Sequence, residues 1–252
     1  MSPERSYQQI ATSLYLRAVL PAFEELALVS PRARSLIDGW RCSVEFAVSR
    51  AGGATVFFQD GNVSVRPERF PTSALSLFFL SPLQLIKQFS GKGFSLPLPR
   101  RGIFRPASLY RFQKIGTLFQ REVQRHPRLL LSVALGSLPS LHAYDFDAQE
   151  LLRRCPAGVA EFGIPSSDIF AWAKWNGSAI AWARGRAPGA VDVRVSFADE
   201  PTALAALRGE LDEMAAIGAG ELTVRGLIPL AETLGLVLAR AAFYMKPGAL
   251  PA

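Results

Sequence analysis

The sequence holds very little histidine and cysteine, the residue types on which most metal sites and many nucleophilic sites depend. Its 252 residues include two of each. His126 and His142 lie in a stretch rich in proline and leucine, without the spacing of metal ligands. Cys42 and Cys155 form no CxxC motif. We therefore expect no metal and no other cofactor, and reduced cysteines that are buried as small apolar residues.

Long uninterrupted apolar runs are also missing. The longest, residues 75–80 and 129–135, are broken well before the ~20 residues that a membrane span requires. The first ten residues, MSPERSYQQI, contain an early acidic residue and no apolar core followed by a cleavage site. These absences predict a soluble protein that stays in the cytoplasm.

Acidic residues are scarce in only one segment. Residues 92–128 carry nine basic and one acidic side chain, whereas residues 1–91 carry nine and seven, and residues 129–252 carry ten and thirteen. The net charge of +7 therefore comes from this one segment.

Apolar residues are abundant and patterned. They make up 49% of the chain, with 17 Phe against 5 Tyr, which predicts a globular fold with a large interior. Strands are expected at residues 43–48, 54–58, 63–65 and 74–79, and the middle two flank the hairpin turn Asp60-Gly61-Asn62. Helices are expected at residues 7–29, with a kink at Pro21, at residues 82–91 and at residues 106–124.

The second half shows a similar order in shorter form. Strands are expected at residues 169–174, 179–183, 191–197 and 221–225, and helices at residues 148–154, 201–209 and 229–244. Four landmarks correspond between the halves: Gly61 with Gly177, Phe79 with Phe197, Gly91 with Gly209, and Gly102 with Gly226. A duplicated unit would explain this, although an alternating order of strands and helices also recurs by chance.

The run from Trp40 to Val123 resembles the sterol carrier protein 2 superfamily. The likeness lies in two alternating strands that reach the Asp60-Gly61 turn, and in the apolar strand 75–79 that leads into a helix ended by Gly91. Residues 191–197, 207–209 and 221–226 look like the later part of the same pattern. Members of the superfamily fold as a five-stranded sheet covered by helices, enclose a tunnel for fatty acyl or sterol ligands, and catalyse nothing by themselves.

The resemblance implies an α+β fold whose mixed sheet is covered on one face by helices, and which the second half could duplicate into a larger continuous sheet. It divides the chain into an N-terminal helix (residues 1–30), a sterol-carrier-like lipid-binding domain (31–128) and a second, shorter α+β unit of the same type (129–252).

A lipid pocket requires concave apolar walls, because each buried methylene contributes ~0.8 kcal/mol and an unpaired polar wall group costs as much or more. For any single candidate, ordinary packing in the core is the stronger interpretation. The candidate ligand-binding residues are Phe57, Phe58, Leu75, Leu77, Phe79, Leu83, Ile86, Phe89, Phe112 and Phe119.

The helix at residues 106–124 is amphipathic and basic. Its apolar face opposes a face of Arg111, Lys114, Arg121 and Arg125, with Lys92, Arg100, Arg101 and Arg105 nearby in the sequence. This face could rest on anionic lipid headgroups or be an ordinary solvated face, and the second interpretation is slightly favoured. Nucleic acid is not expected as a partner, because the aromatic residues lie on the apolar face.

These features favour a carrier that sequesters a fatty acyl, isoprenoid or sterol-like ligand in an apolar cavity. The alternative is a non-catalytic accessory or scaffold protein that holds a partner in lipid or quinone biosynthesis. A cavity filled by the protein's own phenylalanines would favour this alternative. An enzyme ranks third, because no nucleophile elbow or histidine-containing triad accompanies the acidic residues.

Overall fold

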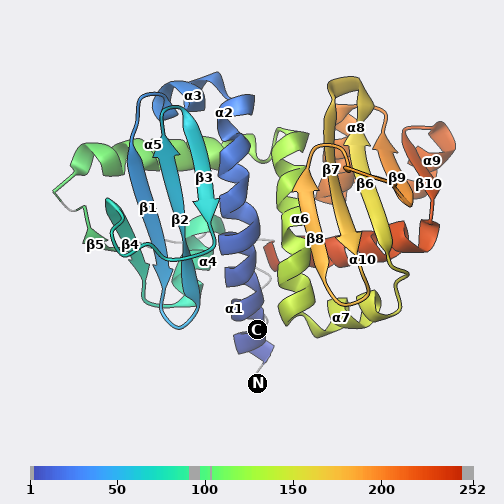
Figure 1. Ribbon diagram of the computed structural model, residues 1–252, viewed down its shortest axis with the longest axis horizontal. Coiled ribbons are helices and arrows are strands. Elements are labelled where there is room, and N and C mark those ends of the chain that lie inside the picture. The colour runs from blue at the N-terminus through green and yellow to red at the C-terminus, as the bar shows by residue number, and fades with distance from the viewer. Residues whose placement is uncertain (1–2, 91–96, 103, 246–252) are drawn as a thin grey trace. The chain divides into compact units, whose positions relative to one another are not determined.

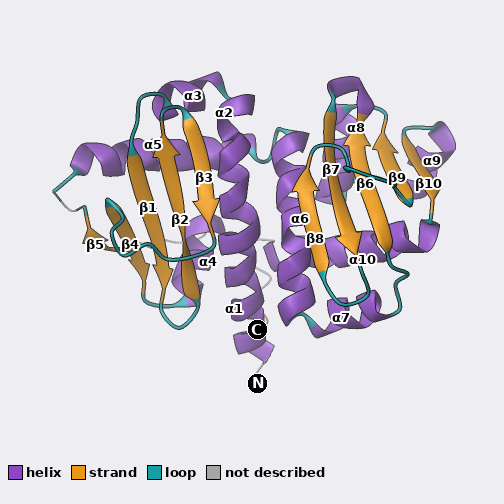
Figure 2. Ribbon diagram, in the orientation of Figure 1, coloured by secondary structure: helices purple, strands orange, loops and turns teal. Residues whose placement is uncertain are grey.

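The computed structural model describes residues 3–90, 97–102 and 104–245. They form two compact units, the first up to Gln124 and the second from Arg125 to Tyr244 (Figure 1). Each unit contains one five-stranded mixed sheet, with helix α5 behind the first sheet and helix α10 behind the second (Figure 2). The predicted α+β class is confirmed, but the sheets are separate, so the second half does not extend the first sheet.

The N-terminal segment is a chain of short helical pieces. α1 (Pro3–Leu14) is followed by a π turn, η1 (Tyr15–Val19), a 3₁₀ turn, η2 (Leu20–Glu25), and α2 (Leu26–Val29). Pro21 explains the break, because proline has no N–H to donate and its ring clashes with the carbonyl one turn earlier. The range predicted as one helix, residues 7–29, is therefore helical throughout, and its irregular part includes the predicted kink at Pro21. α3 (Pro31–Ile37) follows, with its first turn capped by Ser30.

The first sheet is built from β1 (Cys42–Val48), β2 (Gly52–Gln59), β3 (Asn62–Arg66), β4 (Leu75–Phe79) and β5 (Leu98–Arg101), in the order β3-β2-β1-β4-β5. β1 and β4 are parallel, and the other pairs are antiparallel. The predicted hairpin is confirmed, because β2 and β3 are joined at Asp60 and Gly61, both at positive φ.

Two helices complete the first unit, α4 (Pro82–Ser90) and α5 (Pro106–Glu122). Both begin at the predicted proline, which fits the first turn of a helix because its missing N–H would have no partner there. Gly91, the predicted end of the first of these helices, lies outside the described residues.

The second sheet repeats this topology in the order β10-β9-β6-β7-β8. The first strand of each sheet is central, is parallel to the fourth strand, and is antiparallel to the second. The elements of this unit, in chain order, are α6 (Pro127–Tyr144), α7 (Phe146–Arg153), β6 (Gly158–Ile164), η3 (Pro165–Ser167), β7 (Ile169–Trp175), β8 (Ile180–Arg184), β9 (Val193–Phe197), α8 (Glu200–Arg208), α9 (Glu213–Ala219), β10 (Leu222–Gly226) and α10 (Ile228–Met245).

Two glycines that correspond between the halves occupy the same structural position. Gly102 follows β5 and Gly226 ends β10, and both have positive φ. A Cβ atom would lie 2.9 Å from the Ala74 carbonyl oxygen in the first unit and 2.0 Å from the Asp192 carbonyl oxygen in the second. Only glycine fits so close to the backbone that enters the fourth strand.

A buried glutamate occupies the same place in each sheet. Glu45 in β1 and Glu161 in β6 are 3% and 5% exposed, and both lie on the face opposite the helices. Glu45 accepts hydrogen bonds from Arg69 at 2.9 Å and from the Ser76 hydroxyl at 2.6 Å.

Glu161 makes comparable contacts in the second unit. The Glu161 carboxylate accepts the Ala187 backbone N–H at 2.9 Å and lies 3.3 Å from Arg194. Arg69 and Ala187 belong to the connections that run from the third to the fourth strand. Each carboxylate therefore attaches the connection that crosses its own sheet.

Removing Arg69 tests the importance of this attachment. Arg69→Ala should lower the free energy of unfolding by about 2 to 3 kcal/mol, because the Glu45 carboxylate stays buried without its cation. The matched control is Arg41→Ala, which removes an ion pair with Asp60 that is exposed on both sides and should therefore lower the free energy of unfolding much less. Urea denaturation followed by circular dichroism measures both, and equal losses would contradict the proposed role.

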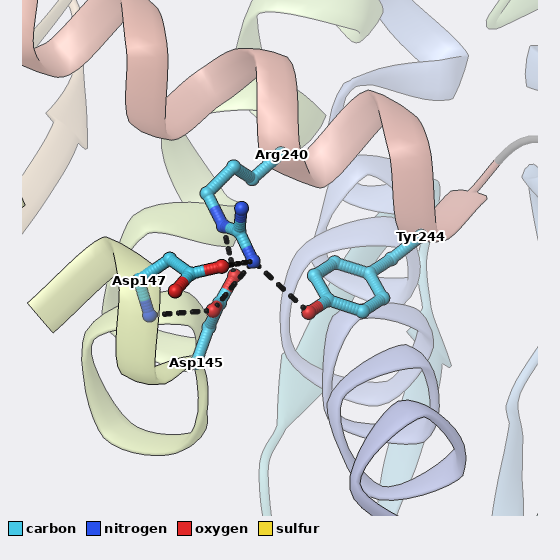
Figure 3. Close-up of polar contacts among 4 residues, drawn as sticks. All are labelled: Asp145, Asp147, Arg240 and Tyr244. Atoms are coloured by element: carbon cyan, nitrogen blue, oxygen red, sulfur yellow. Dashed lines mark hydrogen bonds and ion pairs between the residues drawn. The ribbon is translucent and has the colours of Figure 1, made fainter. Parts of the chain in front are cut away.

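Helix α10 is held on the second unit by packing and by one ion-pair cluster. Its Leu230 side chain lies against Gly158 of β6, where a Cβ atom would come within 2.9 Å. Its Arg240 donates to the buried Asp145 carboxylate and lies 2.8 Å from Asp147 and 3.4 Å from the Tyr244 hydroxyl (Figure 3).

Among the described residues, α10 is also the one helix that is long and apolar enough to cross a membrane by length and composition. A third of it, 33% of the 18-residue window, is buried. The expectation that no segment reaches this length therefore missed α10. Core helices of soluble proteins meet the same test, and the contacts of Leu230 and Arg240 are those of a packed helix.

Replacing the two aspartates one at a time tests how α10 is attached. Asp145 is 3% exposed and also caps α7 by accepting the Asp147 N–H, whereas the Asp147 side chain is 63% exposed. Asp145→Ala should cost about 3 kcal/mol and Asp147→Ala less than about 1 kcal/mol. Guanidinium denaturation of the two variants measures the difference, and a similar cost for both would show that the buried pair does not dominate.

Candidate functional site

The helix side of the first sheet presents apolar side chains. Side chains alternate between the faces of a strand, and the register places Val44 between Val56 of β2 and Leu75 of β4. The opposite face holds the polar residues Glu45 and Ser76. The residues that share the helix side of the three central strands are Cys42, Val44, Phe46, Val48, Ala54, Val56, Phe58, Leu75, Leu77 and Phe79.

Aromatic rings fill the space between this face and its helices. The Phe46 ring lies 6.1 Å from Phe89 of α4 and 5.7 Å from Phe112 of α5, measured between centroids. Phe112 also contacts Phe58 at 6.2 Å, and Phe89 stacks on Tyr15 at 5.2 Å. Favourable aromatic pairs are separated by roughly 4.5 to 7 Å. These rings, with Phe79 at 6.3 Å from Phe46, form one group that we call the Phe46 cluster.

The cover over the Phe46 cluster is incomplete. Phe46 and Phe58 are 3% and 2% exposed, so the part of the cluster that belongs to the sheet is buried. Phe89 and Phe112, which touch Phe46 from the helices, are only half-buried, as is Leu83 of α4. A continuous series of apolar side chains therefore leads from the surface to the centre of the first unit.

Most of the predicted ligand-binding residues of the sheet lie on the helix side, but Phe57 does not. Because Phe58 faces the helices, its neighbour Phe57 faces the opposite side, where it contacts Phe70 at 5.4 Å and Arg66. Leu75, Leu77 and Phe79 are buried on the helix side with Phe58. Of the two neighbouring candidates, only Phe58 therefore lies on the helix side, because side chains alternate along a strand.

The remaining predicted residues lie on α4 and α5, and the buried face of α4 differs from the predicted one. In α4, Ile86 is buried as expected, whereas Leu83 and Phe89 are half-buried, and the unpredicted Leu85 is fully buried. In α5, Phe112 belongs to the Phe46 cluster. Phe119 is instead buried against Phe23 of η2, with 4.0 Å between ring centroids.

The predicted basic face of α5 is divided between two uses. Arg111 donates to the carbonyl oxygens of Leu36 and Asp38 and lies over the Trp40 ring, so it fastens α5 to the end of α3. Its guanidinium is therefore engaged within its own unit, whereas a membrane surface was predicted for it. Lys114, Arg121 and Arg125 are exposed.

Burial raises the pKa values of one tyrosine of the cluster and of one cysteine in each unit. Desolvation, with a smaller effect of Tyr7, raises the pKa of Tyr15 to about 12, so its phenol stays protonated at neutral pH. Burial also raises the pKa values of the Cys42 and Cys155 thiols, which disfavours the nucleophilic thiolate. Across the described ranges, no group of three or more His, Cys, Asp or Glu side chains could hold a metal ion.

A surface pocket of the first unit lies away from the Phe46 cluster. It has a volume of about 350 Å³ and is lined by residues of α2, α3 and their ends, including Leu28, Arg34 and Asp38. None of the predicted ligand-binding residues lines it. The candidate site therefore rests on the apolar face and not on this pocket.

Comparison with known proteins gives matches only at the level of structure. No protein-family model matches the sequence, and no curated protein matches it. One similar solved structure is a stereoselective inverting sec-alkylsulfatase, Pisa1, from Pseudomonas sp., with 19% identity and a TM-score of 0.31. The match covers 40% of this chain and 16% of the alkylsulfatase, so this chain spans a small part of that protein.

Two further similar structures are small proteins that are matched over most of their length. The UbiJ-SCP2 ubiquinone synthesis protein is 22% identical over 42% of this chain and 87% of its own, with a TM-score of 0.33. A conserved hypothetical protein from Thermus thermophilus, related in its description to sterol carrier protein, is 12% identical over 42% and 85%, with a TM-score of 0.32. At these values the matches transfer no ligand or activity. They carry no argument about the fold either, because all three TM-scores lie below 0.5.

Proposed function

We propose that this protein is a non-catalytic carrier that binds a lipid-like apolar ligand on the helix side of the first sheet. The proposed ligand is a fatty acyl, isoprenoid or sterol-like molecule. The sheet would supply the fixed wall of the site, and α4 and α5 would supply the movable wall.

The incomplete cover of the Phe46 cluster carries this proposal. Phe89 and Phe112 contact the buried Phe46 ring and are themselves partly exposed. Rotation of these two side chains would open a path from solvent to an apolar face that offers no polar side chain on its three central strands. A ligand that replaced the rings would gain ~0.8 kcal/mol for each methylene that it buried.

The same ring contacts support a second candidate function. In the described structure the Phe46 cluster occupies the interior with its own side chains. An interior filled by the protein's own side chains is expected of an accessory or scaffold protein that holds a partner in lipid or quinone biosynthesis. The two functions differ in whether an acyl chain enters the first unit.

A charged side chain introduced at the Phe46 cluster should distinguish the carrier function from the scaffold function. Phe112→Asp puts a carboxylate beside Phe46 and Phe58, and an unpaired charge there should weaken binding of a dansylated undecanoic acid at least tenfold. The control is Gln113→Asp, which places the same charge on the exposed side of the same helix and should leave the affinity unchanged. Fluorescence titration measures both variants, with circular dichroism to verify their fold.

Native mass spectrometry of the purified chain supplies an independent readout. A carrier should retain a bound lipid, and the Phe112→Asp variant should lose it while Gln113→Asp keeps it. Absence of any bound lipid, together with no binding of the acyl probe by the unaltered chain, would reject the carrier and leave the scaffold function.

A further inference from the structure

The connection from β5 into α5 combines exposed aromatic and basic side chains at one end of the first unit. Figure 1 shows β5 and the start of α5 at one margin of the first unit. We call this surface the β5–α5 tip. It consists of Leu98, Arg100, Arg101, Phe104, Arg105, Tyr110 and Lys114.

The apolar members of the tip are unusually open to solvent. Phe104 is 96% exposed, Tyr110 59% and Leu98 49%. A phenylalanine that is almost fully exposed contributes nothing to the core of its own unit. Exposed aromatic residues at the margin of a fold are typical of surfaces that bind a partner or enter a membrane interface.

The basic members of the tip lack acidic partners in the described part of the chain. Arg100, Arg101 and Arg105 form no ion pair with a described acidic side chain. Arg100 lies instead over the Phe78 ring at 3.5 Å, and Lys114 lies 4.5 Å from the Tyr110 ring. The sole acidic residue of residues 92–128 is Glu122, at the far end of α5. The positive charge of the tip is therefore uncompensated.

β5 itself disfavours pairing with another strand. It is the edge strand of the first sheet, and its sequence is Leu-Pro-Arg-Arg. Proline removes one backbone donor, and adjacent arginines repel a second basic strand, so this edge resists extension by another copy.

We propose that the β5–α5 tip docks on an anionic lipid surface, with Phe104 and Tyr110 entering the interface and the arginines binding headgroups. Basic residues near such a surface attract anionic lipid, and aromatic rings settle at the headgroup level. This proposal concerns a different surface from the Phe46 cluster and does not require that the cluster bind a ligand.

Vesicle binding tests the proposal with the full chain. The unaltered protein should sediment with vesicles of phosphatidylcholine and phosphatidylserine, much less with pure phosphatidylcholine, and less as salt rises. The combined variant Arg100→Gln, Arg101→Gln, Arg105→Gln should weaken binding about a hundredfold. Phe104→Ser should weaken it about tenfold without changing the salt dependence.

The control variant removes three positive charges outside the β5–α5 tip. Arg32, Arg50 and Arg225 are exposed and lie outside the tip, so their combined change to glutamine should weaken vesicle binding no more than about threefold through the net charge. Equal losses for the two triple variants would overturn the proposal, as would failure of the unaltered chain to bind anionic vesicles.

Two further readouts separate this result from other interpretations. Tighter binding to a duplex DNA than to anionic vesicles, lost in the same triple variant, would assign the tip to nucleic acid and overturn the proposal. Binding of the acyl probe should be unaffected in the triple variant, so failure of the docking surface and failure of the proposed carrier function are distinguishable.

Discussion

The parallel pairing of two central strands is the constraint on which both units depend. β1 and β4 run in the same direction, as do β6 and β9, and parallel strands cannot be joined by a tight turn. The chain must therefore cross each sheet between its third and fourth strands. In both units this crossing is fixed to the sheet by a buried glutamate, Glu45 or Glu161. Because the crossing and its polar anchors use one face, the other face is left to apolar side chains and helices.

The two units differ in what they do with that apolar face. In the first, phenylalanine side chains from the sheet, α4 and α5 meet in the Phe46 cluster. In the second, the side chains of α6 and α10 that cover the sheet are mainly leucine, valine and alanine. A polar contact is also present there, because Arg184 of β8 donates a hydrogen bond to the Ser132 hydroxyl of α6. Net charge is divided in the same way, with the basic excess in residues 92–128 and the acidic excess in residues 129–252. We therefore place both proposed binding surfaces on the first unit.

Much of this architecture could be predicted from the sequence, because most strands carry local signals. The Asp60-Gly61 turn, the alternating run of β9 and the prolines that open α4 and α5 each reflect chemistry within a few residues. β6 was missed although it is the central strand of the second sheet, since two glycines and the buried Glu161 hide its apolar pattern. β5 was missed because Leu-Pro-Arg-Arg becomes a strand only when β4 offers an edge.

The candidate site could be predicted only in outline. Apolar strands indicated which segments surround it, but the side to which Phe57 points depends on register, and the face of α4 depends on what packs around Leu85. The role of Arg111 depends on the carbonyl oxygens of Leu36 and Asp38, which lie far from it in the sequence. Such contacts are decided by tertiary structure, and no local pattern records them.

Glu45 and Glu161 also have different neighbours on the adjacent parallel strand, which matters for the pairing of strands between the two halves of the chain. Ser76 of β4 and Arg194 of β9 occupy the same register position, each opposite the glutamate of its own sheet. If β9 paired with β1, Glu45 would face two arginines, whereas Glu161 beside β4 would face a serine and remain buried without a cation. An exchanged pairing would therefore leave a buried carboxylate in the second sheet without a cation, which would disfavour it.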